Sequence, residues 1–184
     1  MLIDESFKPI ASGSYSWENQ LIDGFWTYSL DDIWKGLRDC YKSLAEDVKE
    51  KYDAELTKIG SIGFSAMMHG YMGLWMRRAS CLYRSVHGAN STTGQAAEAL
   101  TELFSYNIPQ RWSISHLYQA ILNGEEHVDQ ISYLTTLAGY IHWQLTGRKV
   151  LGIGDASGMF PINDKTHQYD ETMVEKFGKL IEDK

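Results

Sequence analysis

The stretch "YLTTLAGYIHWQLTGRKVLGIGDASGMFPIN", residues 133–163, decides the fold of this chain. Its first part has apolar residues at helical spacing, which predicts a helix over residues 133–145 that is broken at Gly147. The next part, "RKVLGIG" at residues 148–154, is short and combines apolar β-branched residues with glycine, which predicts a buried strand. Together with a helix and a buried strand predicted nearer to the start of the chain, this pattern indicates an α/β layer structure.

A single carboxylate, that of Asp155, directly follows this predicted strand. Its neighbours Gly154, Ala156 and Gly158 have small side chains or none, so they leave room for a ligand to approach the carboxylate. A carboxylate in such a place can orient a hydroxyl group and take its proton. The alternative is an Asx turn that closes the strand, which Asp before Ser and Gly often forms. The local sequence alone leaves both interpretations open.

A second helix and strand lie nearer to the start of the chain. Apolar residues recur at intervals of three and four from Ser29, an N-cap residue, as far as Tyr52, which predicts a long amphipathic helix. The sequence "KIGSIGFSAMMHG" then predicts a buried strand at residues 59–64 and a polar turn after it. The turn contains Met68, His69 and Gly70.

Shorter signals complete the expected secondary structure. Two short strands around a turn at residues 6–9 predict a hairpin near the start. Helical spacing, broken by Pro109 and by the Asn123-Gly124 pair, predicts further helices at residues 94–104, 114–122, 125–131 and 171–181. The span of residues 95–145 is therefore expected to be rich in helix.

Composition excludes several classes of function. A net charge of -7 offers no basic surface for nucleic acid, and no apolar run approaches the roughly 20 residues of a membrane span. The first residues lack the basic start and apolar stretch of a signal peptide, so we expect a cytoplasmic protein without nucleic-acid or membrane partners. The cysteines and histidines have no metal-ligand spacing, so no metal site is predicted.

Three stretches, taken in order, resemble the N-terminal domain of the FGGY carbohydrate kinases, the family of xylulokinase and ribulokinase. "DGFWTYSLDDIWKGL" is similar to the segment that opens the family's first helix. "IGFSAMMHG" resembles its strand and Met-His-Gly turn, although Met67 stands where many relatives have Gln. Residues 133–163 resemble the helix, Leu-Thr-Gly turn, strand and Asp-Ala-Ser-Gly segment that follow, which is the most specific of the three.

The resemblance implies an incomplete actin-like, ribonuclease-H-like α/β domain with a helix-rich insertion. It implies ATP-dependent phosphorylation of a sugar or polyol hydroxyl, with Mg²⁺ and ATP bound by the full-length protein and not by this chain. Asp155 matches the family's catalytic base and also faces the substrate. Met68, His69 and Gly70 match residues that line the sugar pocket. The sugar is not specified by these motifs, and a ketopentose is our first expectation.

Relative to that family, residues 1–184 are expected to be a partial N-terminal domain. The sequence contains no Asp-x-Gly-Thr phosphate turn, and we expect the first strand and the C-terminal domain to be absent. We therefore expect an inactive fragment that forms a homo-oligomer or a strand-swapped dimer, because a missing inner strand leaves backbone groups unpaired. The alternative is a non-catalytic module that binds a sugar or a protein.

Residues 75–89 depart from the family pattern. Where a Pro-containing strand followed by Trp and Arg is expected, the chain reads "WMRRASCLYRSVHGA", which fits neither a strand nor a helix. Permissible codons for this stretch, read two nucleotides later, encode Asp-Ala-Glu-Ser-Lys-Leu-Pro-Val-Pro-Phe-Arg-Thr-Trp-Arg, which fits the pattern. We interpret the stretch as a frameshifted translation, in the gene or in its sequencing, and assign no site residue within it.

Overall fold

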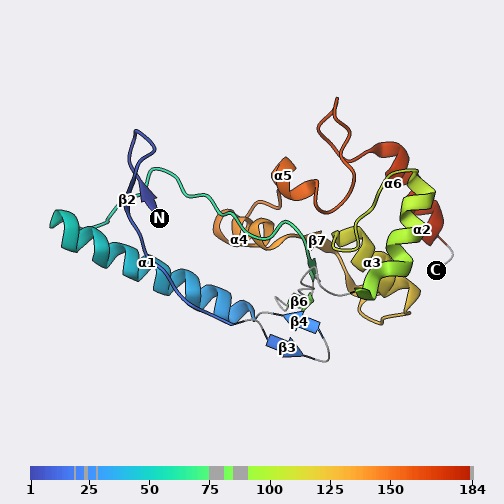
Figure 1. Ribbon diagram of the computed structural model, residues 1–184, viewed down its shortest axis with the longest axis horizontal. Coiled ribbons are helices and arrows are strands. Elements are labelled where there is room, and N and C mark those ends of the chain that lie inside the picture. Colours follow the sequence, from blue (N-terminus) through green and yellow to red (C-terminus); the bar gives the residue numbers. More distant parts are fainter. Residues whose placement is uncertain (19, 23–24, 28, 75–80, 85–90, 183–184) are drawn as a thin grey trace. The chain divides into compact units, whose positions relative to one another are not determined.

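The computed structural model describes residues 1–18, 20–22, 25–27, 29–74, 81–84 and 91–182 (Figure 1). The chain divides into two compact units. The first contains Met1–Gln20 and Tyr28–Gly63, and the second contains Leu21–Thr27 and Phe64–Lys184. Every residue of the candidate site lies in the second unit.

The first unit begins with the predicted hairpin, which is confirmed. Strand β1 (Leu2–Ile3) pairs antiparallel with β2 (Pro9–Ala11). The carboxylate of Asp4 shapes the turn by accepting hydrogen bonds from the backbone N–H groups of Ser6 and Lys8, at 2.8 and 2.9 Å.

The long helix predicted from Ser29 is also confirmed, as α1 (Leu30–Tyr52). The Ser29 hydroxyl accepts a hydrogen bond from Asp32 N–H at 3.1 Å and so caps the first turn. On one face of the helix, Leu44 and Val48 are buried against Ala11 of β2. This helix could be predicted because its N-cap and its apolar spacing both lie within the segment itself.

The strand predicted at residues 59–64 is wrong. Residues 54–67 form neither helix nor strand, and the side chains of Ile59 and Ile62 are 37% and 65% exposed. A strand needs a neighbour to pair with its backbone groups, and no strand of the described residues pairs with this segment.

The second unit is built around a short strand that the sequence did not indicate. Strand β5 (Tyr71–Leu74) is buried along its whole length and lies between β6 (Cys81–Arg84) and β7 (Tyr133–Thr135), both antiparallel to it. A separate pair, β3 (Gln20–Ile22) and β4 (Phe25–Thr27), also belongs largely to this unit.

Three predicted helices of the second unit are confirmed and pack around one core (Figure 1). These are α2 (Gly94–Phe104), α3 (Ser113–Leu122) and α6 (Glu171–Ile181). Leu100 of α2 is fully buried in the core, and the Nζ of Lys176 in α6 donates to the Leu103 carbonyl near the end of α2. A short 3₁₀ turn, Ser91–Thr93, precedes α2.

The remaining predictions between residues 125 and 154 need correction. The helix expected at 125–131 is only a 3₁₀ turn at Val128–Gln130. The helix expected at 133–145 divides into β7 and α4 (Leu137–Thr146), because Thr136 caps α4 by accepting from Gly139 N–H at 3.1 Å. The strand expected at 148–154 is absent, and α5 (Ile153–Ala156) begins at its end.

Part of the aberrant stretch at residues 75–89 has a described backbone. Residues 81–84 form β6, so the expectation that this part fits no strand is wrong. Residues 75–80 and 85–89, on which most of the frameshift hypothesis rests, lie outside the described residues. None of the helices in the described part of the chain combines the length and apolar character that a membrane crossing requires.

Candidate functional site

The Met-His-Gly turn leads directly into the buried strand β5. Gly70 has a φ of +132°, a conformation that side chains rarely allow, and a Cβ there would meet no atom within 4 Å. Its carbonyl accepts a hydrogen bond from the hydroxyl of Ser113 at 2.6 Å. Ser113 is the first residue of α3 and is fully buried, so the turn is fixed to the start of that helix.

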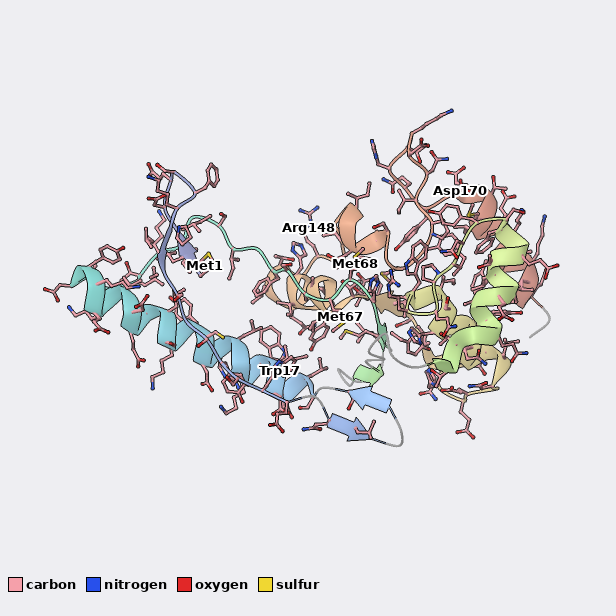
Figure 2. All side chains as sticks on the ribbon, viewed as in Figure 1. Met1, Trp17, Met67, Met68, Arg148 and Asp170 are labelled. Carbon is pink, nitrogen blue, oxygen red and sulfur yellow. The ribbon has the colours of Figure 1, made fainter. Side chains whose placement is uncertain are left out.

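The segment that follows α5 packs directly against the same turn. A Cβ on Gly158 would lie 2.7 Å from the carbonyl oxygen of Met68, a residue labelled in Figure 2. Only glycine therefore fits at this position. The next residue, Met159, accepts a hydrogen bond from Ile114 N–H of α3 at 3.1 Å. The turn, the start of α3 and the segment after α5 therefore meet in one place.

Asp155 lies in α5, one turn before this contact. Its backbone carbonyl accepts from Gly158 N–H at 3.0 Å, and its side chain is half-buried. The expected position at a strand end is wrong, since the residue belongs to a one-turn helix. No group in the described ranges donates a hydrogen bond to the carboxylate, so an Asx turn is not formed there and the carboxylate can accept a proton from a ligand.

The imidazole of His69 joins this arrangement to Arg111, which precedes α3. The Arg111 Nε–H donates a hydrogen bond to His69 Nε2 at 3.0 Å. Burial of the ring, and then the positive charge of Arg111, hold the pKa of His69 below its ordinary value. The backbone of Gly158 interacts with the ring and opposes this shift without cancelling it. The net effect favours the neutral form of the His69 ring.

We expect NMR to show His69 titrating below its ordinary pKa of about 6.5. In the unfolded chain the ring takes up its proton at the ordinary pKa, so between the two values the unfolded state binds more protons than the folded state. The stability that His69 contributes is thus complete above about pH 6.5 and is lost as the pH falls through its folded pKa. His69→Gln should remove this part of the pH dependence. A folded-state pKa at or above the ordinary value would contradict the description of the site.

The structure places the segment that contains Asp155 against the turn of Met68, His69 and Gly70, and it links two further residues to that turn. Met68 contacts Gly158, three residues after Asp155, while Gly70 is bonded to Ser113 and His69 to Arg111. Sequence reasoning missed Arg111 and Ser113 because "PQRWS" contains no motif and no periodicity. The described ranges hold no group of three or more His, Cys, Asp or Glu side chains placed to bind a metal ion.

The sequence profile of the FGGY family of carbohydrate kinases, N-terminal domain, matches residues 2–181. This chain belongs to the FGGY family. The match includes the Met-His-Gly turn, Arg111 and Asp155 within one family domain. Among curated protein sequences, none gives a significant match.

Solved structures of sugar kinases share the fold of this FGGY domain. A xyloylose kinase from Brucella ovis is 19% identical, with a TM-score of 0.73 over 96% of this chain and 37% of its own. A gluconate kinase and a ligand-bound xylulose kinase, both from Lactobacillus acidophilus, are each 21% identical, with TM-scores of 0.73 over 94% of this chain and 36% of theirs. The FGGY chain thus spans little more than a third of the length of these neighbours.

The expected α/β fold of the actin-like class is confirmed in this coarse form. Helices α2, α3 and α4 lie within residues 94–146, close to the expected range of 95–145. That they form an insertion in the FGGY domain stays a prediction.

Proposed function

We propose that this chain forms the sugar-binding part of a carbohydrate kinase that transfers the γ-phosphoryl group of ATP to a sugar hydroxyl. The observation that carries the proposal is the contact at Gly158, which holds the segment of Asp155 against the turn of Met68, His69 and Gly70. Family membership supports the reaction class. The carboxylate of Asp155 accepts no hydrogen bond from the described residues, which supports its assignment as the proton acceptor.

In the proposed reaction, Asp155 orients the attacking hydroxyl and accepts its proton as the oxygen–phosphorus bond forms and ADP leaves. Phosphoryl transfer relies mainly on positioning and on neutralisation of charge, so a correctly placed carboxylate is the main contribution of this part of the protein. The small residues Gly154 and Ala156 leave the carboxylate accessible to a sugar. A Cβ on Gly154 would meet no atom within 4 Å, which supports an open approach on that side.

A ketopentose is the sugar that we propose first. Two of the structural neighbours are described as a xyloylose kinase and a xylulose kinase, and one as a gluconate kinase, so an aldonate is the alternative. Met67, where many family members have Gln, is 37% exposed and so is free to touch a ligand. A thioether in that position removes a hydrogen-bonding group, which favours a substrate with fewer polar groups at that point.

We further propose that residues 1–184, as a partial domain, bind sugar without transferring phosphate. The sequence has no Asp-x-Gly-Thr turn to hold nucleotide phosphates. ATP and Mg²⁺ would then be bound by the complete kinase through residues outside this chain. The same observation favours, as a second candidate, a module that binds sugar and never takes part in catalysis.

Binding and turnover measured in parallel test the proposal. Isothermal titration of the 184-residue chain with D-xylulose, D-ribulose, D-gluconate and glycerol should show binding of at least one of them. A coupled assay with ATP and Mg²⁺ should show ADP release from the complete kinase but none from the chain alone. No binding of any of these compounds would contradict the proposal, and binding without turnover in the complete protein would favour the non-catalytic module.

A further inference from the structure

Neither ring nitrogen of His69 is open to a ligand in the folded chain. Nε2 accepts the hydrogen bond from Arg111, whose guanidinium group only donates and stays protonated. Nε2 therefore carries no proton, and the neutral ring has its proton on Nδ1. Nδ1 is buried and makes no hydrogen bond to the described residues. The imidazole thus offers a sugar hydroxyl no polar atom that is both exposed and unbonded.

Arg111, in contrast, has more hydrogen-bond donors than the contact with His69 uses. Its side chain is exposed, and within the described residues its only hydrogen bond is the one from Nε to His69. The N–H groups on its two Nη atoms have no partner there. Because Nε is held by His69, the planar guanidinium group is fixed in orientation, which reduces the entropy lost when the other donors bind a ligand.

We infer that Arg111 is a substrate-binding residue of this site and that His69 is its positioning residue. This inference rests on the proposed function. A guanidinium group has no acceptor, so it binds the oxygen lone pairs of a substrate: a carbonyl or hydroxyl oxygen of a ketose, or the carboxylate of an aldonate. His69 holds the guanidinium from one side, and the carbonyl of the preceding residue, Met68, packs against Gly158, three residues after Asp155.

Titrations with D-xylulose and D-gluconate test the inference on four variants of the full 184-residue chain. Arg111→Met should weaken binding by about 10-fold or more, the usual effect of losing a hydrogen bond to a charged group, with the larger loss for gluconate if the partner is a carboxylate. Arg148→Met makes the same change at an exposed arginine outside the site and should bind like the wild type. His69→Leu should weaken binding as Arg111→Met does. His69→Gln, which keeps an acceptor for Nε, should bind more tightly than His69→Leu.

The outcomes separate the inference from the proposed function. If the wild type binds a sugar and Arg111→Met binds it equally well, the inference is wrong and the proposed function stands. If the wild type binds neither sugar, both are wrong for these substrates. A readout independent of sugar covers a variant that does not fold: ¹⁵N NMR of the wild-type imidazole should show the proton on Nδ1, and a proton on Nε2 would overturn the inference.

Discussion

Asp155→Asn is expected to slow phosphoryl transfer by the complete kinase about 10²- to 10⁴-fold, the range that a general base usually supplies. Asparagine has nearly the same size and still hydrogen-bonds a hydroxyl, but its amide cannot take the proton. The carboxylate accepts no hydrogen bond from the described part of the protein, so the substitution breaks none there. Sugar affinity and thermal stability should therefore change little.

Asp164→Asn is the matched control for this experiment. Asp164 is an exposed aspartate in the same unit, in the loop before α6. The same change of charge there should leave the steady-state rate of ADP formation unaltered. If the Asp155 variant keeps wild-type kcat, Asp155 is not the base, and an Asp164 variant that loses as much rate would show that the effect is one of net charge.

Gly158→Ala is expected to destabilise the second unit by about 1 to 3 kcal/mol, the usual cost of forcing an extra methyl group into a packed position. The added Cβ would lie 2.7 Å from a backbone oxygen, that of Met68, which cannot rotate away as a side chain could. Either the turn or the segment after α5 must move. Denaturant unfolding followed by circular dichroism measures the change, and sugar titration should show weaker binding because the two parts of the site separate.

Gly154→Ala separates packing from ligand contact in the same segment. A Cβ on Gly154 meets no protein atom within 4 Å, and neither glycine has a φ in the left-handed region. Stability should therefore stay within about 0.5 kcal/mol of the wild type, as for most surface substitutions. If a sugar approaches Asp155 on this side, the methyl group should still weaken its binding. Equal destabilisation by the two substitutions would contradict the close contact described at Gly158.

The sequence predicted the elements whose signals are local and failed where an element depends on a neighbour. Helix α1 has its cap at Ser29 and its own periodicity, so its bounds could be predicted closely. The apolar segments at 59–64 and 148–154 were predicted as strands, but a strand forms only beside another strand, and none in the described residues lies beside them. The predicted Gly147 break and the Thr136 cap together limit α4.

The sequence predicted individual residues of the candidate site but not how they lie together in space. Asp155 and the Met-His-Gly turn were found through the family resemblance. Their spatial link is the contact between Met68 and Gly158, which could not be predicted because these residues lie about 90 positions apart in the chain. The role of glycine at 158 was predicted as room for a sugar, whereas the space is filled by Met68. Arg111 lies in a stretch without a motif, so only the geometry of its bond to His69 reveals it.

We propose that the turn of residues 68–70 and the segment of residues 154–158 form one sugar site. The most direct test is a ¹H–¹⁵N NMR spectrum of the 184-residue chain, recorded during a titration with D-xylulose and then with D-gluconate. We expect the amide signals of these two segments and the side-chain signals of Arg111 to shift together, with one dissociation constant, while those of α1 stay in place. Shifts confined to another part of the chain, or none at saturating concentrations of both sugars, would contradict the claim.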